Sequence, residues 1–157
     1  MQVMLETLVN IPFLKNLPQE QFDLLAPLLK PLNVPSKTTI FEQGDQAEYL
    51  YLISSGTVSI QYKPYDGPKI TLTHLHAGDV FGWSSVVGGE IYTSSAASED
   101  SVEAIRIRGI ELQELCKEHY IAGCMILEKL AEVVSPRWKN AKDQVRDMLQ
   151  NRLYDQT

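Results

Sequence analysis

The spacing of apolar and polar residues divides the chain into three zones. In residues 1–33 the apolar residues recur three and four positions apart, which predicts N-terminal helices that Pro27 and Pro31 keep short. In residues 34–108 the apolar positions alternate with a period of two, and turn signals such as Ser54-Ser55-Gly56 separate the runs. The helical period returns in residues 109–157.

We therefore predict a single, mainly β domain with flanking helices. Short alternating runs between turns are typical of antiparallel strands, so residues 34–108 are expected to form a double-stranded antiparallel β-roll, similar to a jelly roll. Residues 1–33 add N-terminal helices, and residues 109–157 add a long C-terminal helical segment. Ser135 and Pro136 fit a helix start, which leaves open whether Pro136 kinks one helix or separates two.

The last helical stretch carries a narrow apolar stripe on an otherwise charged surface. Its members step by three and four residues: Trp138, Ala141, Val145 and Met148. A stripe of this kind is typical of a helix that pairs with another helix. We expect a homodimer formed through this C-terminal helix.

Charge and composition narrow the classes of function. A hydrophobic content of 44% and a charged content of 22% are ordinary for a soluble globular protein. The net charge of −6 argues against a general nucleic-acid binder, which needs a basic face. The basic residues near the C-terminus alternate with Asp143, Asp147 and Asp155, as on a solvated helix face. The sequence contains no signal peptide and no long apolar span, so no membrane partner is expected.

The two cysteines fit the same picture. Cys116 and Cys124 lie on one predicted helical stretch, where they would be about 12 Å apart along the axis. That separation is too long for a disulfide, so both thiols are expected to be reduced. Reduced thiols and the lack of a targeting segment predict a cytoplasmic location.

Three blocks of residues carry a resemblance to a known family. They are Phe13–Glu20, Ile40–Val58 and Leu75–Gly82, and their order and spacing resemble the cyclic nucleotide-binding domain. This is the β-roll of the catabolite activator protein, of cyclic-nucleotide-dependent kinases and of gated channels. The resemblance implies a regulatory, non-enzymatic domain. It covers nearly the whole chain.

The residues that bind the cyclic nucleotide are absent from the expected positions. In nucleotide-binding members, the segment after Phe-Gly is a phosphate cassette that begins with Gly-Glu and ends in Arg. In this chain the Glu position falls on Trp83 and the Arg position on Tyr92. Hydrogen bonds to charged groups are worth about 1.5–3 kcal/mol each. The loss of both anchors would weaken a micromolar ligand by roughly two to four powers of ten.

A small-molecule ligand can still be expected at this segment. Backbone N–H groups and hydroxyls there could hold a non-standard nucleotide, a neutral metabolite or a weaker anion. By resemblance to the activator, residues just after Pro136 would close over the ligand. No certain cofactor is implied. The candidate ligand-binding residues are Phe81, Gly82, Trp83, Ser84, Ser85, Tyr92, Thr93, Ser94, Arg137 and Trp138.

Three functions remain open at this point. The leading one is a free-standing, bacterial sensor module with a diverged ligand. The second is a ligand-free dimerisation or partner-interaction module, in which Trp83 fills the space that a ligand would occupy. The third is a metal-dependent, cupin-like enzyme built on His74 and His76, with Asp79 and Glu90 as the nearest further ligands. Because the chain ends at Thr157, we expect no helix-turn-helix domain and no nucleic-acid partner.

Overall fold

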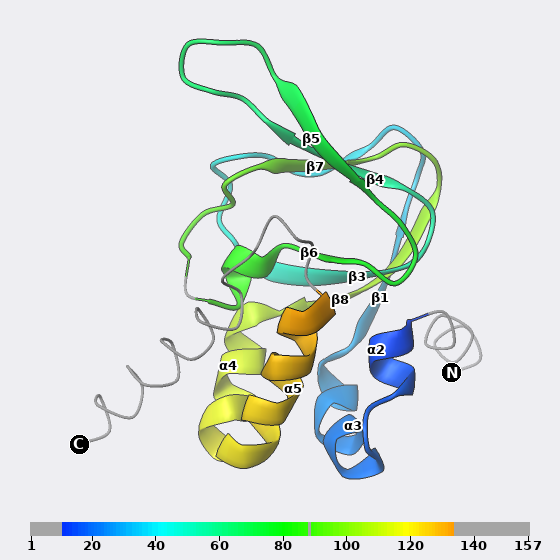
Figure 1. Ribbon diagram of the computed structural model, residues 1–157, viewed down its shortest axis with the longest axis vertical. Coiled ribbons are helices and arrows are strands. Elements are labelled where there is room, and N and C mark those ends of the chain that lie inside the picture. The colour runs from blue at the N-terminus through cyan, green and yellow to red at the C-terminus, as the bar shows by residue number, and fades with distance from the viewer. Residues whose placement is uncertain (1–10, 88, 134–157) are drawn as a thin grey trace.

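Two four-stranded antiparallel sheets face each other in the structure, a computed structural model that describes residues 11–87 and 89–133 (Figure 1). The first sheet contains, in spatial order, β1 (Lys30–Val34), β8 (Val102–Arg108), β3 (Tyr49–Ser55) and β6 (Val80–Phe81). The second contains β2 (Thr39–Phe41), β7 (Ser95–Ser98), β4 (Val58–Tyr62) and β5 (Ile70–Leu75). The predicted antiparallel β-roll with flanking helices is confirmed.

The main helices lie together on the outer side of the first sheet (Figure 1). The N-terminal ones are α2 (Pro12–Lys15), α3 (Gln19–Leu25) and the 3₁₀ turn η1 (Ala26–Leu28). The later ones are the 3₁₀ turn η2 (Trp83–Ser85), α4 (Gly109–Glu118) and α5 (Tyr120–Val133). In the part of the chain that the structure describes, no helix is both long and apolar enough to cross a membrane.

The β-roll begins earlier than the apolar pattern predicts. Residues 30–33 were expected to belong to the helical zone, but β1 starts at Lys30 and includes Pro31. A proline cannot donate a backbone hydrogen bond, so it is tolerated only where one side of a strand is unpaired. β1 meets this condition because it is the edge strand of the first sheet.

The first sheet has a hydrophobic core on each face. Leu50 and Leu52 of β3 point into a core shared with the helices, which we call the helical core. Tyr51 and Ile53 point the other way, into the core between the two sheets, which we call the roll core. Successive side chains of a strand alternate between faces. A strand between two cores therefore has an almost continuous apolar sequence.

The two cysteines lie on different helices, so the expectation of one helical stretch is wrong. α4 ends at Glu118, its C-cap residue His119 has a φ of −132° and a ψ of 74°, and α5 begins at Tyr120. Neither Gly nor Pro marks this break in the sequence. The two helices pack closely: a Cβ atom at Gly123 would lie 2.7 Å from the Cα of Cys116. Both thiols are free, as predicted.

The predicted dimer stripe lies outside the described residues. This applies to Trp138, Ala141, Val145 and Met148, and also to the question of a kink at Pro136. The homodimer therefore stays a prediction.

The packing of α4 against α5 predicts that Gly123→Ala destabilises the fold. The added methyl group would overlap the backbone of Cys116, and overpacking of this kind costs about 1–3 kcal/mol. Urea unfolding would measure the loss. Ile121→Ala on the same helix is the control, because Ile121 is 76% exposed and its truncation should change stability by less than about 0.5 kcal/mol. Equal stability of Gly123→Ala and the wild type would contradict the packing described here.

Candidate ligand-binding site

The segment that resembles the phosphate cassette starts with a sharp turn after β6. Gly82 has a φ of +84°, and a Cβ atom there would lie 2.6 Å from the carbonyl oxygen of Tyr49. Glycine is the residue that adopts this conformation without strain. In the η2 turn that follows, Ser85 donates both its N–H (3.1 Å) and its hydroxyl (2.8 Å) to the carbonyl of Gly82. These two donors are thus engaged within the turn itself.

Trp83 lies in the helical core, so both expectations for its side chain are wrong. The indole is 1% exposed and belongs to the same cluster as Val80, Leu50 and Ile107. It neither faces a ligand in the roll nor fills the roll. Phe81, the last residue of β6, points into the roll core. The backbone then turns at Gly82, and Trp83 lies on the helix side of the sheet.

The other predicted residues divide between buried and exposed positions. Ser84, Ser85 and Ser94 are buried, whereas Thr93 is exposed. Ser85 also holds the turn against α4, because a Cβ atom at Gly109 would lie only 1.9 Å from the Ser85 carbonyl oxygen. Arg137 and Trp138 lie outside the described residues.

Tyr92 occupies the place where the resemblance implies the phosphate-binding arginine. Its side chain is 4% exposed, and its ring stacks on Phe41 with 3.6 Å between ring centroids. Its hydroxyl donates to the carbonyl oxygen of Tyr49 (2.6 Å) and accepts from the Tyr49 N–H (2.9 Å). Both roles of the hydroxyl are therefore used on the backbone of β3.

Five aromatic side chains gather in this part of the roll, and we call them the aromatic cluster: Phe41, Tyr49, Tyr51, Phe81 and Tyr92. The rings of Tyr51 and Phe81 stack with centroids 4.8 Å apart. Burial raises the pKa of Tyr51 and also that of Tyr92, because an ionised phenolate would lose its hydration. Packed neutral rings thus occupy the region in which the family cassette would place charged groups.

A cation lies beside this cluster, on β8, and it was not among the predicted ligand-binding residues. The guanidinium carbon of Arg106 in β8 is 4.3 Å from the centroid of the Tyr49 ring. Its Nε atom is buried and has no hydrogen-bond partner among the described residues. An unsatisfied buried donor costs about 1–3 kcal/mol. Val102, Ala104 and Arg106 alternate along the strand, so the sequence could have placed Arg106 on the same face as two small apolar residues.

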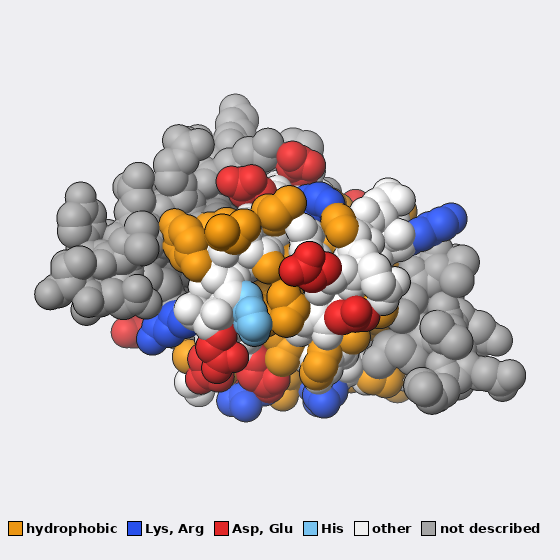
Figure 2. All heavy atoms as spheres, turned by 90° about the horizontal axis from the view of Figure 1, so that it is seen from below, with side chains coloured by type: hydrophobic (Ala, Val, Ile, Leu, Met, Phe, Trp, Pro, Cys, Tyr) orange, Lys and Arg blue, Asp and Glu red, His pale blue; other side chains and the backbone are white. Residues whose placement is uncertain are grey.

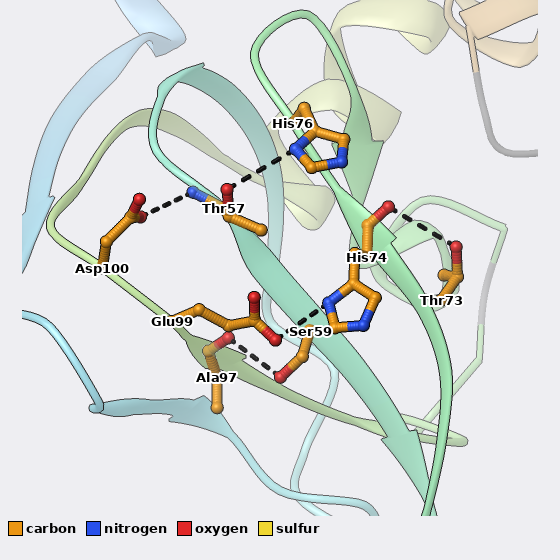
Figure 3. A network of polar contacts seen from close by, with 8 residues as sticks. All are labelled: Thr57, Ser59, Thr73, His74, His76, Ala97, Glu99 and Asp100. Atoms are coloured by element: carbon orange, nitrogen blue, oxygen red, sulfur yellow. Dashed lines mark hydrogen bonds and ion pairs between the residues drawn. The ribbon is translucent and has the colours of Figure 1, made fainter.

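The two histidines considered as metal ligands contact different partners (Figure 3). His74 Nδ1 is 2.8 Å from a carboxylate oxygen of Glu99, and His76 Nδ1 is 3.5 Å from the hydroxyl of Thr57. Thr57 is also tied to the turn after β7, since its N–H donates to Asp100 (2.8 Å). No group of three or more His, Cys, Asp and Glu side chains within residues 11–87 and 89–133 is placed to hold a metal ion.

A separate groove lies on the helical side of the molecule. It has a volume of about 490 Å³ and is lined by α3, by His119 and by the first part of α5, including Gln21, Leu24, Tyr120, Ile121 and Met125. Figure 2 shows this side of the molecule, where apolar side chains gather with carboxylates among them. The side-chain oxygen of Gln21 is buried without a partner in the described structure.

Comparisons with known proteins agree with the fold and the sequence blocks. The family model of the cyclic nucleotide-binding domain matches residues 31–119. The CRP-like cAMP-activated global transcriptional regulator of Mycobacterium tuberculosis is 28% identical over 77% of this chain and 52% of its own length. The chain belongs to the cyclic nucleotide-binding domain family, and it spans about half the length of that relative.

Solved structures show the same fold. The catabolite activator protein of Thermus thermophilus superposes with a TM-score of 0.66 at 26% identity, covering 88% of this chain and 63% of that one. The N-terminal domain of a transcriptional regulator from Streptomyces coelicolor gives a TM-score of 0.67 at 20% identity, covering 87% and 95%.

The contacts of Tyr92 predict that Tyr92→Phe lowers the free energy of unfolding. The change keeps the ring stack but removes the partner of both backbone groups of Tyr49, at a cost of about 1–3 kcal/mol. Urea unfolding would measure it against Tyr65→Phe, which removes a hydroxyl from a fully exposed side chain. If both variants were as stable as the wild type, the Tyr92 bonds would carry no net stability.

The buried phenols also predict a fall in stability at alkaline pH. A raised pKa means that the folded state favours the neutral phenol, so this contribution is complete below about pH 10 and is lost as the pH rises above that value. Unfolding free energies between about pH 9 and about pH 11 should therefore decrease more steeply for the wild type than for Tyr51→Phe. Equal slopes would show that ionisation of Tyr51 does not contribute.

Proposed function

We propose that this chain is a regulatory sensor domain whose ligand is neither cAMP nor cGMP. One observation carries the proposal: Tyr92 stands at the cassette arginine position, and its ring and hydroxyl are both engaged by the protein itself. To bind a cyclic nucleotide in the usual way, the domain would have to break these contacts and bury a phosphate without the cassette cation. A buried anion without a partner is strongly unfavourable.

The ligand is a small molecule other than the standard cyclic nucleotides, and its binding changes the arrangement of the helices. The η2 turn touches the start of α4 through Ser85 and Gly109, so a ligand that moved this turn would also move α4. A ligand shifts such an equilibrium only if its affinity differs between the two arrangements. Trp83 links the same turn to the helical core.

The remaining parts of the proposal concern the whole protein. We propose a non-enzymatic, cytoplasmic module that binds no nucleic acid and dimerises through the apolar stripe of its C-terminal helix, formed by Trp138, Ala141, Val145 and Met148. The matched relative from Mycobacterium tuberculosis is a transcriptional regulator, and this chain spans about half of it. The net charge of −6 remains the support for the proposal on nucleic acid.

A ligand-free partner-interaction module is the second candidate. This candidate was expected to have Trp83 inside the roll, but Trp83 lies in the helical core, and the rings of the aromatic cluster pack against one another in the roll. The groove beside α3 favours this candidate, because Ile121 is 76% exposed and Tyr120 and Met125 are each 43% exposed. Scattered exposed apolar residues are common, but a contiguous set along a groove is more typical of an interaction site.

Isothermal titration calorimetry with cAMP and cGMP tests the proposed function. We expect no saturable heat for the wild type up to millimolar nucleotide. Tyr92→Arg should give saturable heat with cAMP, with a Kd at least about tenfold below the millimolar limit of the wild type, since it restores a guanidinium for the phosphate. Tyr65→Arg, which makes the same charge change at a fully exposed site, should have no effect. Micromolar binding by the wild type would overturn the proposal.

A further inference from the structure

Arg106 projects from the first sheet towards the roll core. Along β8, Val102 and Ala104 belong to the roll core, whereas Ile105 and Ile107 belong to the helical core. Arg106 follows this alternation and therefore lies on the roll side. Its guanidinium covers the ring of Tyr49, an arrangement that is favourable but does not neutralise the charge.

The charge of Arg106 has no counterion in the described structure. The ion pairs that involve β8 are those of Arg108, whose side chain is 3.9 Å from Glu48 and 3.8 Å from Glu111. Arg106 forms no ion pair with a carboxylate of residues 11–87 and 89–133, and its Nε–H is buried without an acceptor. A partly buried guanidinium normally has a carboxylate, a phosphate or several acceptors around it. The site therefore has an excess of donors.

Neighbouring strands add to this positive character. The residue opposite Arg106 on β1 is Lys30, and the residue opposite on β3 is Tyr51. Lys30 shares a strand face with Leu32 and Val34, both of which pack on the roll core, so its exposed ammonium lies at the outer end of the same face. Arg106 and Lys30 thus form a pair of adjacent cations on one sheet face.

This pair lies close to the start of the cassette. Tyr51 separates Arg106 from Phe81, because it pairs with both residues across the sheet. Phe81 directly precedes Gly82, where the cassette turn begins. A molecule seated against the aromatic cluster would therefore have a cation within reach that comes from β8 and not from the cassette.

We propose that Arg106, with Lys30 as a second cation, forms an anion-binding site at the edge of the roll core. This inference rests on the function proposed above and states the class of the diverged ligand, a small molecule that carries a phosphate or a carboxylate. The anion accepts from Nε–H and from a terminal nitrogen of Arg106, in the two-point geometry that a guanidinium offers.

Proton–nitrogen NMR of arginine Nε–H groups tests the site, with inorganic phosphate and acetate as separate probes at constant ionic strength. The signal missing from the spectrum of Arg106→Lys identifies Arg106. We expect this signal to shift saturably with phosphate, with acetate or with both, and the probe that acts identifies the preferred anion. Arg106→Lys, which keeps the charge, and Arg106→Gln should each weaken binding at least about tenfold, read from neighbouring backbone amides. Urea midpoints show that each variant is folded.

Arg108→Gln is the matched control, because Arg108 lies on the same strand but is already paired with Glu48 and Glu111. It should change phosphate or acetate binding by less than about twofold. No shift of the Arg106 signal with either probe would overturn the site while leaving the proposed function standing. Tight cAMP binding that Arg106→Gln left unchanged would overturn both.

Discussion

The central strands of the first sheet, β3 and β8, lie between two hydrophobic cores, and this constraint determines how the rest of the structure can be built. Every residue of β3 and β8 must point either to the helices or to the roll, and a shift by one residue would exchange the two cores. Leu50 and Tyr51 show the consequence, since neighbouring residues serve different cores. The turn at Gly82 lies at the boundary between the two cores, so its geometry couples the roll to the helices.

At the position of the cassette arginine, the roll has the packed, neutral side chain of Tyr92 in place of a charged one. A charged side chain that binds a ligand in a poorly hydrated site needs an opposite charge beside it, and in the empty site that charge is missing. Tyr92 avoids that requirement because its ring is apolar and its hydroxyl is satisfied by the backbone of Tyr49. The same contact fixes the end of β3 beside the cassette. This part of the roll is thus stable without a bound molecule.

Arg106 differs from Tyr92 because it is charged and has no counterion in the described structure. A guanidinium is weakly hydrated and tolerates contact with an aromatic face, which explains how it can lie over Tyr49. That contact leaves its hydrogen-bonding capacity unused at Nε. The aromatic cluster and Arg106 together give the roll a neutral interior with one cationic edge.

The architecture could be predicted from the sequence because it depends on local periodicity and on the order of three sequence blocks. The change from helical to alternating spacing, with turn signals such as Ser54-Ser55-Gly56, indicated a β-roll between helices. The break at His119 was missed because no Gly or Pro marks it. The start of β1 was predicted too far along the chain because Pro31 is typical of a helix end. A proline also fits a strand at the edge of a sheet, but the sequence does not show that β1 is an edge strand.

The chemistry of the site was determined only in part by the sequence. Trp83 and Tyr92 stand at the positions where the resemblance implies Glu and Arg, and this can be read from the sequence in any fold. Which face Trp83 occupies depends on the backbone at Gly82, and the partner of the Tyr92 hydroxyl is 43 residues away in the chain. Arg106 reaches the aromatic cluster through strand pairing between β3 and β8. Contacts of this kind join residues that are distant in sequence, so only the tertiary structure could decide them.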